Sequence, residues 1–350
     1  MYDKVRRKKI TRLDEPNYTI DRSVYTRFDQ RQNVFGRMLY DKDAPFYKKD
    51  MYKNVAKIIR QKKEGYSRIS FAHVMAGWTV YDYFHGAFSR DHLQVPNSIM
   101  SRPSLEKYKI SNKKAMSDQI KQIAHMYGAT QVGICRLNRQ WVYARDMEGG
   151  EVDIPDGFQT AIVMAIAMDE KKIAMSPAFA ASAETAAGYS RMAFCIACLA
   201  EFIRHLGYRA ISMGNDTGLS IPLALDAGLG ELGRLGFLIT PEFGPCVRLC
   251  KVFTDMPLIP DKPICFGVTE FCKQCNKCAD ACEAGAIQTE KEPSFDIICP
   301  SNNKGILRWS VNHDKCYQFW VDNGGDCSNC ISACPFDRRK SGITQDEKEA

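Results

Sequence analysis

Two runs of cysteine near the carboxyl end constrain this 350-residue chain more than any other feature. The first reads F-C-K-Q-C-N-K-C-A-D-A-C, and the second ends in C-S-N-C-I-S-A-C-P. A Cys-x2-Cys-x2-Cys segment wraps one [4Fe–4S] cube, and where two cubes are present the fourth cysteine binds the other one. We therefore expect two clusters with crossed ligands: Cys272, Cys275, Cys278 and Cys334 on the first, and Cys282, Cys316, Cys327 and Cys330 on the second.

Zinc is the alternative metal for these runs. Structural zinc sites usually pair two Cys-x2–4-Cys knuckles, which three thiolates and a fourth at x3 fit poorly. The runs also depart from the usual cluster pattern, because Glu283 replaces the proline that Pro335 supplies in the second run, and ten residues separate Cys316 from Cys327. The other cysteines have too few neighbouring ligands and are interpreted as buried thiols: the helical pair Cys195 and Cys198, and Cys135, Cys246, Cys250, Cys265 and Cys299.

Length and composition indicate a globular protein of two or three units, with 45% hydrophobic and 25% charged residues. Thiolate-bound clusters need a reducing setting during assembly. No stretch approaches the roughly 20 uncharged apolar residues of a membrane span. Arg6-Arg7 invites a twin-arginine reading, but the residues that follow are polar. We expect a cytoplasmic protein; the alternative is an exported, membrane-associated mature form with its leader removed.

The chain divides into four expected parts. Residues 1–110 form a basic, aromatic unit, 111–262 a core of alternating helices and strands, 263–340 the two-cluster unit, and 341–350 a charged tail. Residues 1–70 carry a balance of +10 within a chain of net charge +7, which could attract nucleic acid or an anionic membrane. Interleaved Tyr, Phe and Asp instead favour a solvated arm wrapped over a neighbouring domain, and no nucleic acid partner is expected.

The core pattern predicts an α/β domain. Helices are expected over 112–127, 181–206 and 223–229, and strands over 130–137, 160–168, 208–213 and 247–253. A G-x-G-x-x-G sequence at Gly228, Gly230 and Gly233 follows a helix rather than a strand, so it supports a dinucleotide site only weakly. The aromatic residues within 71–100 are interpreted as part of the core or of a pocket wall.

Four blocks in fixed order resemble the catalytic core of corrinoid-dependent reductive dehalogenases. They are E-T-A-A-G-Y-S-R-M-A (184–193), M-G-N-D-T-G-L-S-I-P (213–222), D-A-G-L-G-E-L-G-R-L-G-F-L-I-T-P-E-F-G (226–244) and V-R-L-C-K-V-F-T-D-M-P-L (247–258). The resemblance extends roughly over 111–336. It implies a nitroreductase-like α/β (α+β) corrinoid-binding core with a C-terminal ferredoxin-like two-[4Fe–4S] unit. Base-off cobalamin, reduced through the clusters to cob(I)alamin, would remove halogen from an organohalide.

The resemblance also implies site residues. Tyr189 matches the proton donor, Arg248 the arginine beside it, and Asn215 a polar side chain of the pocket. A permanent guanidinium charge would stabilise the phenolate left after proton transfer. The resemblance further implies cobalamin contacts at Gly236, Thr240, Pro241 and Phe243, and Trp320 as pocket wall. Thr185 lies one helical turn before Tyr189 and is expected to face the same pocket. Taken singly, Tyr189 fits a core tyrosine, Arg248 a surface charge and Asn215 an ordinary turn residue.

Two rival functions stay open. Epoxyqueuosine reductases, which act on tRNA, resemble this chain but use a carboxylic acid as proton donor, where this chain has Tyr189. A dicluster electron carrier would bind no corrinoid, and Asp91-His92-Leu93 does not provide a histidine cobalamin motif (D-x-H-x-x-G), which fits either a corrinoid without protein ligand or none. Expected partners are a small organohalide and a low-potential electron donor protein or quinol-linked membrane anchor, and a homodimer is compatible with the sequence.

Overall fold

A four-stranded antiparallel sheet forms the centre of the computed structural model, which describes residues 10–84 and 103–336. The strands run in the order β2 (Gln131–Arg136), β3 (Thr160–Ala167), β7 (Val247–Thr254) and β4 (Ala210–Met213). The arginine pair at 6–7, the Asp91-His92-Leu93 sequence and the predicted tail at 341–350 lie outside the described residues. All four predicted strands are present, and β4 begins two residues later than expected.

Both faces of the sheet are buried, which explains the continuous apolar sequence of β3. Ile162, Met164 and Ile166 face one hydrophobic cluster, while Ala161 and Val163 face another. The alternation follows from the two-residue period of a strand. Helices therefore cover the sheet from two sides.

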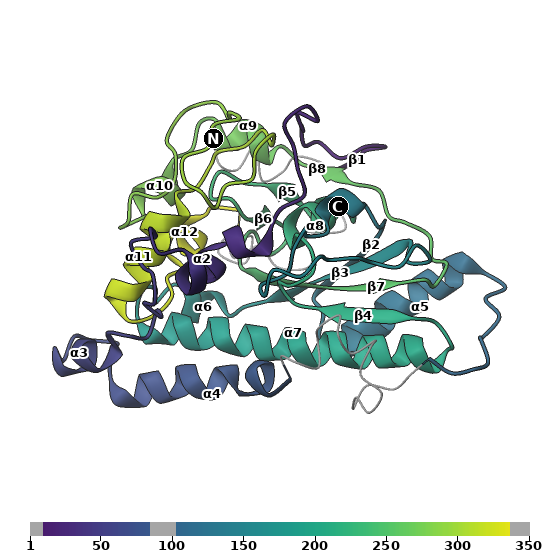
Figure 1. Ribbon diagram of the computed structural model, residues 1–350, viewed down its shortest axis with the longest axis horizontal. Coiled ribbons are helices and arrows are strands. Elements are labelled where there is room, and N and C mark those ends of the chain that lie inside the picture. The colour runs from purple at the N-terminus through teal and green to yellow at the C-terminus, as the bar shows by residue number, and fades with distance from the viewer. Residues whose placement is uncertain (1–9, 85–102, 337–350) are drawn as a thin grey trace, which may run out of the picture.

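Two helices cover the first face, and a third packs on the outer side of one of them (Figure 1). They are α5 (Lys113–Met126), the long α7 (Phe179–His205), and α4 (Arg68–Phe84), which packs along α7. Asn112 caps α5 by accepting a hydrogen bond from the Ala115 amide, and Gly128, at φ +101°, follows its end. Within the described part of the chain, only α7 is long and apolar enough to cross a membrane, and half of its most apolar window is buried in the protein.

The second face is covered by shorter pieces. These are the 3-10 turn η4 (Arg139–Trp141), α8 (Ser220–Asp226), and the hairpin of β5 (Glu231–Leu232) and β6 (Leu238–Ile239). The helix predicted at 223–229 begins earlier, at Ser220, and is followed by Gly228 at φ +72°. Asp226 ties this layer to the N-terminal arm, accepting hydrogen bonds from Tyr18 (2.7 Å) and Trp141 (3.0 Å).

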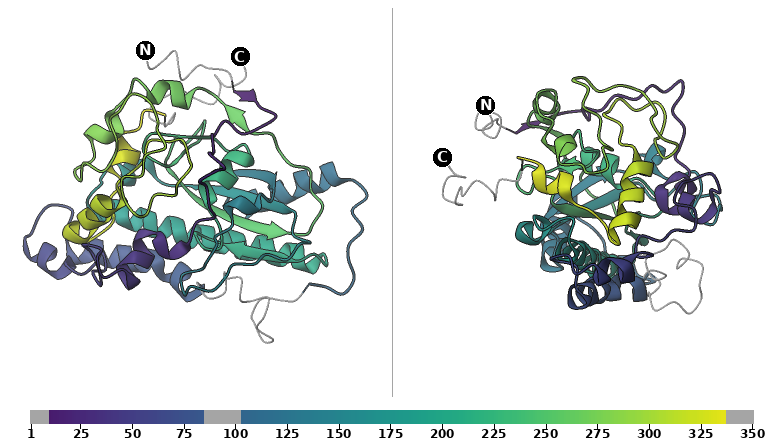
Figure 2. Two further views of the ribbon diagram at one scale, coloured as in Figure 1. Left: turned by 45° about the horizontal axis from the view of Figure 1, so that its top comes forward. Right: turned by 90° about the vertical axis from the view of Figure 1, so that its left-hand side faces the viewer.

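The cysteine-rich segment lies at one end of the sheet. Its helices are α9 (Val268–Cys272), α10 (Lys277–Asp280), α11 (His313–Asn323) and α12 (Asn329–Ala333), and α12 also contacts α6 (Glu170–Ile173). The N-terminal arm spans the molecule, from β1 (Thr11–Arg12), paired with β8 (Ile264–Cys265), to η1 (Gln30–Gln32), α2 (Val34–Tyr40) and α3 (Val55–Arg60) (Figure 2). The basic N-terminal segment thus lies over the neighbouring parts of the chain, as expected.

Candidate active site and cluster-binding segments

Tyr189, Asn215 and Arg248 meet in one small cavity of about 140 Å³. They come from α7, from the loop after β4 and from β7. The Asn215 side-chain amide donates a hydrogen bond to the Tyr189 hydroxyl oxygen at 2.8 Å. The Arg248 guanidinium carbon lies 5.3 Å from the centre of the Tyr189 ring. The structure therefore brings together the three residues that the sequence singles out.

Arg248 is held beside Tyr189 by α7 itself. Its guanidinium donates to the Thr185 hydroxyl at 3.0 Å, and its Nε lies 3.2 Å from the sulfur of Met168. Thr185 stands one helical turn before Tyr189, so the two face the same side of α7. Between them Gly188 leaves room for the arginine, because a Cβ there would lie 3.1 Å from the Arg248 Cγ. The sequence pattern did not single out Gly188.

Aromatic side chains from α4 enclose Tyr189. The ring centres of Trp78 and Tyr81 lie 4.9 and 5.1 Å from that of Tyr189. Burial, together with the neighbouring Tyr189, raises the pKa of Tyr81, so its hydroxyl stays protonated. These aromatic residues therefore pack around Tyr189 as part of the protein interior, which is one of the two roles predicted for the aromatic residues within 71–100, although the sequence alone does not select these two residues.

Buried polar side chains hold the loop that carries Asn215. Lys251 is fully buried and donates to the Gly214 carbonyl at 2.6 Å and to the Ser220 hydroxyl at 3.1 Å. Burial lowers the pKa of Lys251 to about 8, while the nearby Asp216 opposes that shift. The Tyr143 hydroxyl donates to the Asn215 carbonyl at 3.0 Å. The supporting lysine looks like an ordinary strand residue in the sequence.

A larger cavity of about 400 Å³ adjoins the small one. The two share wall residues from the loop after β4, from α8 and from the β5–β6 hairpin, namely Asn215, Ser220, Ile221 and Phe237. Its walls are mainly apolar and aromatic, with polar side chains that include Asn303, Arg308 and His313. Burial lowers the pKa of His313 to about 4, and the charge of Arg308 adds to that shift. An apolar cavity with a few polar groups is typical of a cofactor or ligand site.

The eight motif cysteines form two adjoining groups. Burial raises the pKa of Cys334, and the charges of three neighbouring thiols raise it further: Cys272, Cys278 and Cys275. Burial raises the pKa of Cys316 to about 12, and its thiol neighbours are Cys282 and Cys327. Cys330 interacts with Cys316, Cys327 and Cys282, and also with Cys278 of the first group. The interacting thiols therefore fall into the two sets of four that the crossed arrangement requires. The assignment of these cysteines as cluster ligands stays a prediction.

A [4Fe–4S] cube and a single ion place different demands on the spacing of their ligands. Among residues 10–84 and 103–336, no three Cys, His, Asp or Glu side chains converge closely enough to hold one metal ion. Each thiolate of a cube binds a different iron atom, so its ligands stand further apart than those of one zinc ion.

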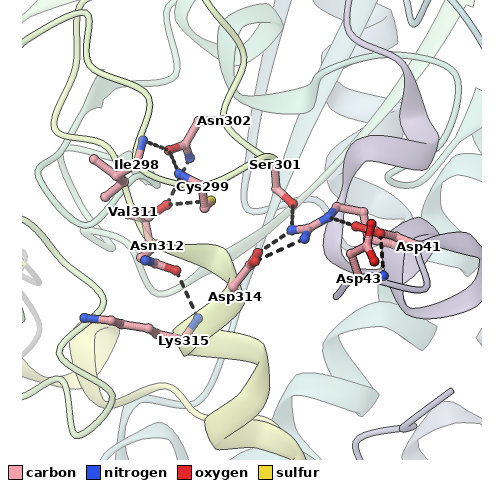
Figure 3. A network of polar contacts seen from close by, with 11 residues as sticks. Asp41, Asp43, Ile298, Cys299, Ser301, Asn302, Val311, Asn312, Asp314 and Lys315 are labelled. Carbon is pink, nitrogen blue, oxygen red and sulfur yellow. Dashed lines mark hydrogen bonds and ion pairs between the residues drawn. The ribbon is translucent and has the colours of Figure 1, made fainter. Parts of the chain in front are cut away.

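A polar network anchors the second run to the arm (Figure 3). Arg37 of α2 bonds to Asp314 at the start of α11, to Asp41 at 2.8 Å and to Ser301 at 3.3 Å. The Asn312 side chain caps α11 by accepting from the Lys315 amide. This network positions the helix that carries Cys316.

The same network extends to Cys299 (Figure 3). The Cys299 thiol donates to the Val311 carbonyl at 3.6 Å, and the Asn302 amide donates to the same oxygen at 2.9 Å. Cys299 is therefore a structural thiol of this loop, as the sequence interpretation has it.

Residues 271–338 match the family model described as a 4Fe-4S dicluster domain, so this segment is a two-cluster unit. The chain is 36% identical over 322 residues to a tetrachloroethene reductive dehalogenase of Sulfurospirillum multivorans, a match that covers 79% of this chain and 63% of that protein. Over most of its length, this chain is therefore similar to the reductive dehalogenases.

A solved reductive dehalogenase structure, described as suggesting a mechanism for B12-dependent dehalogenation, has a fold similar to that of this chain. Its TM-score is 0.72 at 25% identity, covering 94% of this chain and 44% of that one. The epoxyqueuosine reductase of Listeria monocytogenes is a more distant relative, 31% identical over 130 residues that cover 35% of this chain and 31% of that protein. The chain thus spans less than two thirds of each of these proteins.

The remaining residues implied by the dehalogenase resemblance lie in two places. Gly236, at φ +77°, lines the large cavity. Thr240, Pro241 and Phe243 lie in the turn between β6 and β7, where Thr240 is fully buried and the other two are half-buried. The Thr240 hydroxyl donates to the Gly244 carbonyl and accepts from the Phe243 amide. Cobalamin contact stays a prediction for all four.

Trp320 lies on α11 and reaches the cavity region only through another aromatic residue. Its ring packs against Phe35, which lines the large cavity, with ring centres 6.4 Å apart. Its role as pocket wall stays a prediction. The cysteines outside the motifs are buried thiols, except that Cys198 and Cys265 are only half-buried.

Proposed function

We propose that this chain is the catalytic part of a reductive dehalogenase. The reaction is R–X + 2 e⁻ + H⁺ → R–H + X⁻, in which the two clusters deliver electrons one at a time and Tyr189 delivers the proton. The observation that carries the proposal is the contact of Asn215 and Arg248 with Tyr189 in a cavity that Ile331, between Cys330 and Cys334, also lines. The proposed proton donor and the proposed electron supply would therefore stand close together.

The large cavity is the proposed corrinoid site. Its apolar walls and its polar side chains, Asn303, Arg308 and His313, suit a large amphiphilic group. A corrinoid bound there would supply a strongly reducing cobalt centre that breaks the carbon–halogen bond. The small cavity, which shares Asn215 and Phe237 with it, would then hold the organohalide.

The protein's own residues manage the proton. Asn215 donates its amide N–H to the Tyr189 oxygen, so one lone pair is occupied and the O–H is free to point elsewhere in the cavity. Both this hydrogen bond and the guanidinium over the ring favour the anion that forms after transfer. Trp78 and Tyr81 cover the ring and limit water beside it.

Anaerobic reconstitution tests the function directly. The full chain is loaded with iron, sulfide and cobalamin, and reduced viologen serves as donor in a screen of chloroethenes against halogenated phenols. We expect about eight iron atoms and one cobalt per chain, with halide release only when cobalamin is present. About eight iron atoms with no retained cobalt and no halide would leave the electron-carrier function in its place.

The accessory parts of the function are proposed on the same basis. Electrons would enter from a low-potential donor protein or a quinol-linked membrane anchor, and the chain would work in a reducing compartment or as a membrane-associated exported form. Cluster ligation is proposed as crossed, because Cys334 interacts with thiols of the first run, and Cys282 with Cys316, Cys327 and Cys330 of the second.

A further inference from the structure

Arg234 is a fully buried cation in the turn between β5 and β6. Its guanidinium donates to the main-chain carbonyls of two predicted cluster ligands, Cys272 (2.6 and 3.2 Å) and Cys275 (3.1 Å). It also donates to the carbonyls of Gln288 (2.9 Å) and Glu290 (2.8 Å). Arg234 therefore fastens the loop that would wrap the first cluster.

Arg234 contacts carbonyl groups and an aromatic ring rather than a carboxylate. In the part of the chain that the structure describes, none of the ion pairs includes Arg234; its acceptors are carbonyl dipoles and the face of Trp309, 4.6 Å from the guanidinium carbon. Burying an unpaired cation is costly, and neutral donors could satisfy the same carbonyls. A negatively charged group beside it would offset that cost, and a cluster with four thiolates is such a group.

The second cysteine group has a different environment. Its sulfurs receive neutral hydrogen bonds, from the Ser176 hydroxyl and the Asn329 amide to Cys327 and from the Ala286 amide to Cys282. The nearby cation Arg37 is already paired with Asp314 and Asp41. The buried positive charge of Arg234 thus lies beside the first cysteine group.

We propose that Arg234 raises the reduction potential of the cluster bound by Cys272, Cys275, Cys278 and Cys334. On reduction the cluster takes one electron from a low-potential one-electron reductant and gains one negative charge. A fixed positive charge in a buried, weakly screened setting stabilises that added charge. Net charge and hydrogen bonding are among the known determinants of cluster potentials.

Glu231, three residues earlier in the same hairpin, provides a matched control of opposite sign. It is buried, and its carboxylate accepts from the amides of Phe266 (2.6 Å) and Val268 (3.2 Å), where the helix that ends at Cys272 begins. Replacement by glutamine keeps an acceptor oxygen and removes the negative charge. The two positions therefore test charge rather than general disturbance of the loop.

The experiment is an EPR-monitored potentiometric titration with dithionite, on the full chain reconstituted anaerobically with iron and sulfide. In Arg234→Gln we expect one of two cluster signals to shift to a more negative midpoint potential while the other is unchanged. Glu231→Gln should shift the same signal to more positive potential, and Arg234→Lys should stay near wild type. Wild-type potentials in Arg234→Gln, or equal shifts in the Gln and Lys variants, would overturn the proposal.

If Arg234→Gln does not load the first cluster, the Arg234→Lys variant distinguishes a role of charge from a role in holding the loop. A loaded Arg234→Lys variant at wild-type potential would then support the need for charge, whereas loss of the cluster in both variants would assign Arg234 to holding carbonyls only. The inference rests on the proposed cluster ligands and needs neither corrinoid nor organohalide. Its failure and failure of the dehalogenase function are therefore separately visible.

Discussion

The two cysteine runs and the Tyr189 cavity are built in opposite ways. The cysteines are spaced within short loops and helices, so most of each site is already specified locally. The Tyr189 cavity takes side chains from α7, the loop after β4 and β7, which meet only in the folded protein, and α4 adds rings that pack on Tyr189. The difference teaches where each site is vulnerable: the first to loss of a ligand, the second to small displacements of the elements around it.

Loss of a cluster ligand should have the largest effect. Cys334→Ser removes a thiolate that the crossed assignment gives to the first cluster, and α12 also carries Cys330 of the second group. We expect loss of the first cluster, disturbance of the second, and loss of dehalogenation. Iron and sulfide analysis with EPR measures this, and the iron content should fall from about eight to four or fewer atoms per chain.

Cys198→Ser is the matched control, because this thiol is only half-buried on α7 and belongs to neither group. It should keep the full iron content. Equal iron loss in the two variants would contradict the distinction between motif and non-motif cysteines, and full iron in Cys334→Ser would exclude it as a ligand.

Replacing the proton donor should have the next largest effect. Tyr189→Phe keeps the ring contacts with Trp78 and Tyr81 but removes the hydroxyl that Asn215 contacts. General acid catalysis contributes about 10²–10⁴-fold, so halide release should fall by that factor, with cluster and cobalamin spectra unchanged. Tyr208→Phe, whose hydroxyl bonds to the Tyr108 carbonyl, should retain activity. Full turnover in Tyr189→Phe would remove Tyr189 from the mechanism.

The sequence predicts the two cysteine runs more completely than the Tyr189 cavity. Cysteine spacing is short-range information, and the strands and long helices follow from apolar periodicity, so 112–127 and 160–168 emerge as α5 and β3. Tyr189, Asn215 and Arg248 were accessible only through resemblance of whole blocks. Taken singly, each has an ordinary structural explanation.

Supporting residues could not be predicted because their roles depend on tertiary approach. Lys251 looks like any strand lysine until β7 is placed beneath the Asn215 loop, and Gly188 becomes necessary only where Arg248 crosses α7. Arg234 is one polar residue in a glycine-rich turn until that turn lies against the carbonyls of Cys272 and Cys275. Such long-range contacts leave no periodic trace in the sequence.

His313 lies where the two regions meet, since it lines the large cavity and begins α11, the helix of Cys316. Its pKa of about 4 in the folded chain is below the ordinary 6.5, so between these values the unfolded chain binds a proton that the folded chain does not. Stability contributed by neutral His313 is therefore lost as pH falls through this range. Lowering the pH from 7.5 to 5.5 should cost about 1.3 kcal/mol through His313.

Urea unfolding of wild type and His313→Gln at these two pH values measures that contribution. The variant should lose less stability on acidification, because glutamine does not titrate. Identical losses would mean that the histidine is not kept neutral by its burial beside Arg308.

The smallest predicted effect tests how finely the Tyr189 cavity is adjusted. Thr185→Val removes the acceptor of the 3.0 Å hydrogen bond from Arg248 and keeps the shape of the side chain. One such bond is worth about 0.5–1.5 kcal/mol, so we expect turnover to fall by roughly 2- to 10-fold, with iron content and cluster potentials unchanged. Ser190→Ala, on the adjacent face of α7, removes a contact with the Gly77 carbonyl and provides the comparison. A loss of activity in Thr185→Val that exceeds the loss in Ser190→Ala would show that the position of the guanidinium matters to the proton donor. An unchanged rate would mean that contact with the Tyr189 ring suffices to hold Arg248 in place.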